Sequence, residues 1–117
     1  FPGESIHPGA TRLAYVGVCA YNQGKYWQVS DYLFDKKDEL PVYLSAEDIA
    51  VLADKTDLDL GKLNQCLDSS AASIKVNRDY ADGFRFGVGG TPTFFVNGQK
   101  IEGVVPLEAW ERFVKQF

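Results

Sequence analysis

The sequence predicts an α/β domain in which about five helices precede one β-hairpin and one closing helix. Apolar residues recur at helical spacing over residues 10–88. After Gly89–Gly90 the chain becomes β-branched and aromatic. It then reaches Asn97–Gly98, which favours a tight hairpin turn because both residue types tolerate positive φ. We therefore expect an irregular lead-in over residues 1–9, a helical module over 10–88 and a ββα portion over 89–117.

Composition excludes three classes of protein. Of the 117 residues, 45% are hydrophobic, which suffices for one core, and 14% are aromatic, which is too many for a disordered tail. No apolar run approaches the roughly 18 residues of a membrane-spanning helix. The 16 acidic residues outnumber the 12 basic ones, the net charge is −4, and no Lys/Arg cluster occurs. Nucleic-acid binding needs a basic face, so proteins or small molecules are the expected partners.

The helical module follows a lead-in that contains two prolines and two glycines. A first helix is expected from Ala10 to the stop signal Asn22–Gly24. A second is expected from Lys25 to about Leu40, where Pro41 ends regular structure. The apolar face of the first helix is expected at Leu13, Ala14, Gly17, Val18 and Tyr21.

Three further helices are expected next. The segment Ser45–Asp48 resembles a capping box ahead of a third helix, and Asp59 can cap a fourth. Ser69 or Ser70 starts a fifth, which runs towards Val88.

The ββα portion consists of a strand over Thr91–Val96, a returning strand over Gln99–Glu102 and a helix that opens at Pro106. An isolated hairpin is only marginally stable in water. Phe94 and Phe95 point to opposite faces of the strand. The closing helix covers one face only, and the helical module is the candidate cover for the other. The sheet is therefore expected to be incomplete, with an edge that needs further strands.

The segment Gly87–Gly98 resembles the cis-proline loop and following hairpin of DsbA-like thiol–disulfide oxidoreductases, which belong to the thioredoxin superfamily. His7–Ala10, Cys19–Trp27 and Leu63–Ser69 are similar to segments of the helices inserted in that family. The resemblance implies a thioredoxin-like fold with a helical insertion. It also implies formation or isomerisation of disulfides in exported proteins, without a cofactor, in the periplasm or another extracytoplasmic compartment of bacteria.

Members of that family carry a strand, a helix that begins with a Cys-x-x-Cys pair and a second strand ahead of their helical insertion. This chain starts with Phe1 rather than Met, and neither of its cysteines has a partner two residues further on. We therefore expect the C-terminal part of a larger enzymatic domain, with no catalytic residue and no activity of its own. Thr91 and Pro92 are expected to face the substrate, a protein or peptide with a thiol or disulfide. The missing N-terminal segment, or a second copy, is expected to complete the sheet.

Cys19 and Cys66 are interpreted as a structural disulfide between two inserted helices, with buried free thiols and a second redox pair as the alternatives. Two cysteines and the single His7 are too few for a zinc site, so no metal is expected. Two other functions stay open: a glutathione-dependent isomerase or transferase of the same fold, and a non-catalytic peptide-binding domain. Three aromatic residues of the second helix are expected to pack in the core: Tyr26, Trp27 and Phe34.

Overall fold

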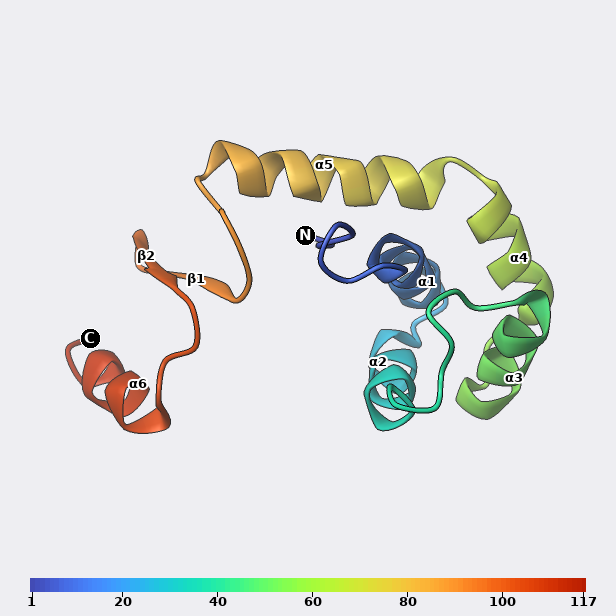
Figure 1. The fold of residues 1–117 in the computed structure, drawn as a ribbon, viewed down its shortest axis with the longest axis horizontal. Helices are drawn as coiled ribbons and strands as arrows, with labels where there is room; N and C mark the ends of the chain where they lie inside the picture. Colours follow the sequence, from blue (N-terminus) through green and yellow to red (C-terminus); the bar gives the residue numbers. More distant parts are fainter. The chain divides into compact units, whose positions relative to one another are not determined.

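The computed structural model describes residues 1–117 as two compact units, Phe1–Asp82 and Gly83–Phe117. Figure 1 shows short helices in the first unit, and a hairpin followed by one helix in the second. None of the helices has the length and apolar character needed to cross a bilayer. The elements are α1 (Ala10–Asn22), α2 (Tyr26–Asp35), α3 (Ala46–Thr56), α4 (Leu60–Asp68), α5 (Ala71–Arg85), β1 (Thr93–Val96), β2 (Gln99–Glu102) and α6 (Leu107–Val114).

The core of the first unit lies between α1, α2, α3 and α4. Helix α1 contacts α2 and α4, and α3 contacts the same two helices, so the four helices surround one apolar interior. Ile49 and Leu52 of α3 and Leu63 of α4 are among its largest fully buried side chains. Helix α5 adds the buried residues Ala72 and Val76 near its start.

The capping residues explain where α3 and α4 begin. Ser45 Oγ accepts a hydrogen bond from Asp48 N at 3.1 Å, and Asp48 Oδ2 accepts one from Ser45 N at 2.8 Å. Asp59 Oδ1 accepts a hydrogen bond from Lys62 N at 2.9 Å. These caps satisfy backbone N–H groups that the first turn of a helix leaves without partners. The predicted capping box and the predicted Asp59 cap are therefore confirmed.

Glu4 ties the lead-in to the start of α1. Its two carboxylate oxygens accept hydrogen bonds from Gly9 N and Thr11 N, each at 2.8 Å. The bond from Thr11 and then the bond from Gly9 lower the pKa of Glu4, because both favour the charged carboxylate. Gly9 itself has φ of 89° and lies tightly against Val42: a Cβ added at this position would lie 2.1 Å from Val42 O.

Two helices end earlier than predicted. Helix α2 ends at Asp35 rather than near Leu40, and turns follow in place of a continued helix. Helix α5 ends before Val88, because Gly87 adopts φ of 80° and Val88 N donates a hydrogen bond to Gly83 O at 2.8 Å. A glycine in the left-handed region ends a helix, and the backbone hydrogen bond that spans five residues around it satisfies one of the last carbonyl groups of the helix.

Of the apolar face predicted for α1, only Val18 packs against the core, and it is partly buried. The buried residues of α1 are Val16, Cys19 and Ala20. Both faces of α1 are apolar, and helical spacing alone does not show which of two such faces packs inward. The predicted face instead lines an open groove of the first unit: Leu13, Ala14, Gly17, Val18 and Tyr21.

The second unit is built on the antiparallel pair β1 and β2, which form a two-stranded sheet. Asn97 has φ of 47° and Gly98 has φ of 80°, as the predicted hairpin turn requires. On one face, Phe94 packs against Trp110 of α6 with ring centroids 4.8 Å apart. On the other face, Phe95 packs against a single aromatic ring and stays 51% exposed. One side of this sheet is therefore thinly covered.

The order of helices, hairpin and closing helix is as predicted. The first strand begins at Thr93 rather than Thr91, because Pro92 has no N–H group to donate to a sheet. The two compact units divide after Asp82, inside α5, whereas the predicted modules 10–88 and 89–117 divide at its expected end. Contacts between elements do not test that division of the sequence, which stays a prediction.

Candidate functional site

The segment between α5 and β1 holds both residues that are predicted to face a substrate. Thr91 and Pro92 are exposed and lie directly before the first residue of β1. The peptide bond between Thr91 and Pro92 is cis, the isomer that the resemblance implies. We call the segment Gly87–Pro92 the proline loop.

Two hydrogen bonds hold the end of the proline loop that leads into β1. Thr93 Oγ1 donates to Gly90 O at 2.6 Å, which closes a short turn around Thr91. Gly103 N, just after β2, donates to Pro92 O at 2.9 Å. Both bonds connect the loop to the hairpin, so the hairpin fixes the position of Thr91.

The other end of the proline loop is held by the end of α5 and by β2. Lys100 Nζ donates to Gly87 O at 2.9 Å, and the same ammonium lies 3.0 Å from Glu102 Oε1. Next to this contact, the rings of Phe86 and Phe95 meet edge to face, with centroids 6.4 Å apart. A polar contact and an aromatic contact therefore fix the loop to one face of the hairpin.

Between these anchors the proline loop presents backbone groups to solvent. Gly89, Gly90 and Thr91 are exposed, and their N–H groups have no hydrogen-bond partner in the chain. The carbonyl group of Thr91 is likewise unpaired. Neighbouring N–H and C=O groups held in a fixed segment pair well with an extended peptide, as an added strand pairs with a sheet. The loop is thus a candidate peptide-binding site.

Comparison with known proteins decides the family. A family model described as Thioredoxin matches residues 3–116, nearly the whole chain. The chain belongs to the thioredoxin family. Its helices, hairpin and closing helix form a thioredoxin-like α/β fold, as the resemblance implies. No solved structure matches the chain.

Several proteins named as sodium/proton antiporters contain a similar stretch. The "Na(+)/H(+) antiporter NhaA 3" of Salinispora tropica is 32% identical over 108 residues, which are 92% of this chain and 16% of the antiporter. The "Na(+)/H(+) antiporter NhaA" of Herminiimonas arsenicoxydans is 33% identical over 97 residues, 83% of this chain and 15% of the antiporter. The "Na(+)/H(+) antiporter NhaA 1" of Mycolicibacterium vanbaalenii is 32% identical over 105 residues, 88% of this chain and 16% of the antiporter. The chain therefore spans less than a fifth of these relatives.

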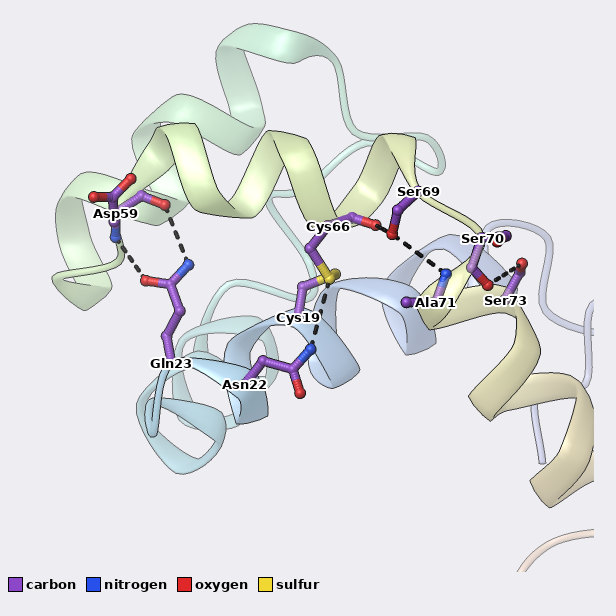
Figure 2. The surroundings of a disulfide bond; sticks show 9 residues. All are labelled: Cys19, Asn22, Gln23, Asp59, Cys66, Ser69, Ser70, Ala71 and Ser73. Carbon is purple, nitrogen blue, oxygen red and sulfur yellow. Dashed lines mark hydrogen bonds between the residues drawn. A yellow bond between two sulfur atoms is a disulfide. The ribbon is translucent and has the colours of Figure 1, made fainter.

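Both cysteines of this thioredoxin-family chain lie in one disulfide, Cys19–Cys66, which joins α1 to α4 (Figure 2). The two Cα atoms are 5.8 Å apart, and Cys19 is only 1% exposed. On the same side of α4, the side-chain amide of Gln23 makes two backbone bonds to Asp59, at 2.8 and 3.2 Å. The structure thus contains the disulfide, and no cysteine is free. The alternative of buried free thiols is therefore wrong, whereas the structural role of the disulfide stays a prediction.

The first unit also has an apolar groove, which is lined by α1, α2 and the start of α5. Trp27 and Phe34 line it and are 72% and 73% exposed, and Tyr26 is 41% exposed. The prediction that these aromatic residues pack in the core is therefore wrong. The reason is that α2 turns only a narrow face inward, with Val29 as its one buried residue, so its other large side chains lie outside.

The structure also places His7 and the acidic residues. His7 is exposed, and no three side chains of His, Cys, Asp or Glu are placed to hold a metal ion. The sequence reasoning missed one pair that belongs to the site, Lys100 and Glu102. Opposite charges two residues apart on a strand lie on the same face, and this spacing is the signal that could have shown them.

Proposed function

We propose that this chain supplies the substrate-binding part of a DsbA-like protein thiol–disulfide oxidoreductase. One observation carries the proposal: the proline loop is anchored at both ends, yet the backbone groups of Gly89, Gly90 and Thr91 stay exposed and unpaired. An extended substrate segment would pair with these groups. In this proposal Thr91 binds the substrate backbone, and Pro92 turns the chain so that the groups face outward.

Disulfide exchange requires a thiolate that attacks one sulfur of a disulfide and releases the other as a thiolate. Cys19 is buried in the core and bonded to Cys66, and residues 1–117 contain no Cys-x-x-Cys pair. The attacking thiolate must therefore come from another segment or another protein. We propose that it lies at the start of a helix, where the helix dipole lowers the pKa of a cysteine. The chain alone is inactive in this proposal.

The free edge of β1 is the proposed place for the strand that accompanies such a helix. Strand β1 carries no charged residue, whereas β2 carries Lys100 and Glu102. Charged side chains protect an edge strand from pairing, so β1 is the better acceptor. We propose that an N-terminal segment or a second copy pairs there, and that the protein works in the periplasm or another extracytoplasmic compartment, where the Cys19–Cys66 disulfide persists.

Fluorescence anisotropy tests the proposal with a fluorescein-labelled peptide of alternating valine and serine that has one S-methylated cysteine. Wild-type chain is expected to bind it. Thr91→Pro removes the backbone N–H and should abolish binding, whereas Thr91→Ala keeps both backbone groups and should bind like wild type. Equal binding by wild type and Thr91→Pro, with native amide protection of the hairpin in both, would show that the loop is not the site.

A second candidate function follows from the relatives. We propose that the chain is a thioredoxin-like segment of a longer protein that also contains a sodium/proton antiporter, because the similar stretch covers 92% of this chain but 16% of the antiporter of Salinispora tropica. Mass spectrometry of the native protein, purified with an antibody against this chain, tests it. Peptides from a transporter on the same polypeptide are expected, and a native polypeptide without them contradicts this second proposal.

A further inference from the structure

We propose that Lys100 is a positioning residue for the proline loop: its ammonium group holds Gly87, and through Gly87 it holds the unpaired backbone groups in the arrangement that accepts a peptide. The consequence for peptide binding rests on the proposed function. The positioning itself rests on geometry within the second unit alone.

Lys100 contacts the loop from β2, which follows the loop in the sequence. It lies on β2 opposite Phe95 of β1, so both side chains lie on the same face of the hairpin, against which Phe86 packs. Lys100 Nζ is 2.9 Å from Gly87 O and 3.0 Å from Glu102 Oε1. Glu102 shares this face and forms an ion pair with the same ammonium. A long, flexible side chain is thereby held in one orientation.

Gly87 is well suited to accept this hydrogen bond. It follows the last turn of α5, where carbonyl groups lack helical partners and where a cation interacts favourably with the helix dipole. Its φ of 80° belongs to the left-handed region, and a Cβ added at Gly87 would lie 3.2 Å from Lys100 Nζ. The missing side chain leaves the space that the ammonium group approaches. Conformation and contact therefore both favour glycine here.

Removal of this anchor should loosen the start of the loop and leave its end in place. The bonds from Thr93 to Gly90 and from Gly103 to Pro92 do not involve Lys100. Without Lys100, the loop start keeps two helix-end backbone bonds, from Gly87 N and Val88 N, and one aromatic contact. The unpaired groups would then sample more conformations, and a peptide would have to order them when it binds.

Amide hydrogen exchange on the 117-residue chain tests the positioning. Lys100→Met removes the ammonium and keeps the length of the side chain, Lys100→Arg keeps a donor, and Lys62→Met removes an exposed lysine of the first unit as a charge-matched control. We expect the amides of Gly87 and Val88, which donate to Phe84 O and Gly83 O at the start of the loop, to exchange about three- to tenfold faster in Lys100→Met. Residues 94–96 should keep wild-type rates, and so should every amide in the other two variants. Wild-type exchange at Gly87 and Val88 in Lys100→Met would overturn the inference.

The labelled valine/serine peptide separates this inference from the proposed function. Its Kd should rise about three- to tenfold in Lys100→Met and stay unchanged in Lys100→Arg. If wild type binds no peptide, the proposed function fails, but the exchange rates still decide whether Lys100 positions the loop. If exchange accelerates and Kd does not change, the link between Lys100 and binding is overturned. If Lys100→Met does not fold, Glu102→Gln replaces it. Faster exchange at Gly87 and Val88 is then expected, and wild-type rates there would contradict the inference.

Discussion

Loss of the Cys19–Cys66 disulfide should destabilise the first unit strongly. The bond joins α1 to α4, and its two cysteines are 47 residues apart in the chain. A crosslink over such a long stretch removes many conformations from the unfolded chain, and breaking it returns them. The chain-entropy relation for 47 residues gives about 4 kcal/mol at 25 °C. A domain has a total stability of only about 5–15 kcal/mol, so this loss is a large share.

Urea unfolding followed by far-UV circular dichroism measures the effect. Wild type in a non-thiol reductant keeps both sulfur atoms and loses only the covalent link, so its difference from the oxidised chain isolates the crosslink. Cys19→Ala/Cys66→Ala also removes the sulfur atoms and should be at least as unstable as the reduced chain. A reduced chain whose free energy of unfolding lies within about 1 kcal/mol of the oxidised value would refute the reasoning.

The other predictions concern packing, pH, a backbone position and association. Leu63 is fully buried, so Leu63→Ala should lower the free energy of unfolding by about 2–5 kcal/mol in urea titrations. The pKa of Glu4 is lower in the folded chain than in the unfolded chain, so Glu4 contributes to folding stability. This contribution is complete above the ordinary glutamate pKa and is lost as the pH falls through the pKa of the folded chain. Glu4→Gln should therefore flatten the acid limb of stability against pH, and an unchanged limb would contradict this. Gly9→Ala should cost more than about 1 kcal/mol in thermal melts, because φ is positive and Val42 O is too close, whereas Gly3→Ala, which meets only the His7 ring at 3.9 Å, should be neutral. The free edge of β1 predicts self-association in size-exclusion chromatography with light scattering, and a monomer that binds no hydrophobic dye would count against it.

Features set by neighbouring residues could be predicted from the sequence. Ser45 and Asp48 cap a helix through bonds across three residues, and Asn97–Gly98 turns a hairpin through its own backbone angles. The strand predicted over Thr91–Val96 is likewise present, although it begins at Thr93. The order of the elements therefore followed from short segments.

Features set by distant contacts could not be predicted. Helix α1 has two apolar faces, and only its contacts with α2 and α4 decide that Val16 packs inward while Leu13 lines a groove. The exposure of Trp27 could not be predicted for the same reason, because helical spacing does not show how many other helices pack against a given helix. The Cys19–Cys66 disulfide was predicted through the resemblance to a family with inserted helices, because the spacing of the two cysteines does not itself show that α1 and α4 are neighbours. Lys100 meets Gly87 only once the hairpin has formed.

Two-dimensional ¹H–¹⁵N NMR of the chain, titrated with the unlabelled valine/serine peptide, tests the central claim most directly. If the proline loop binds an extended substrate, the largest shift changes will fall on the amides of Gly89, Gly90 and Thr91, and they will disappear in Thr91→Pro. Shift changes confined to the groove around Trp27, or no change at saturating peptide, would contradict the account.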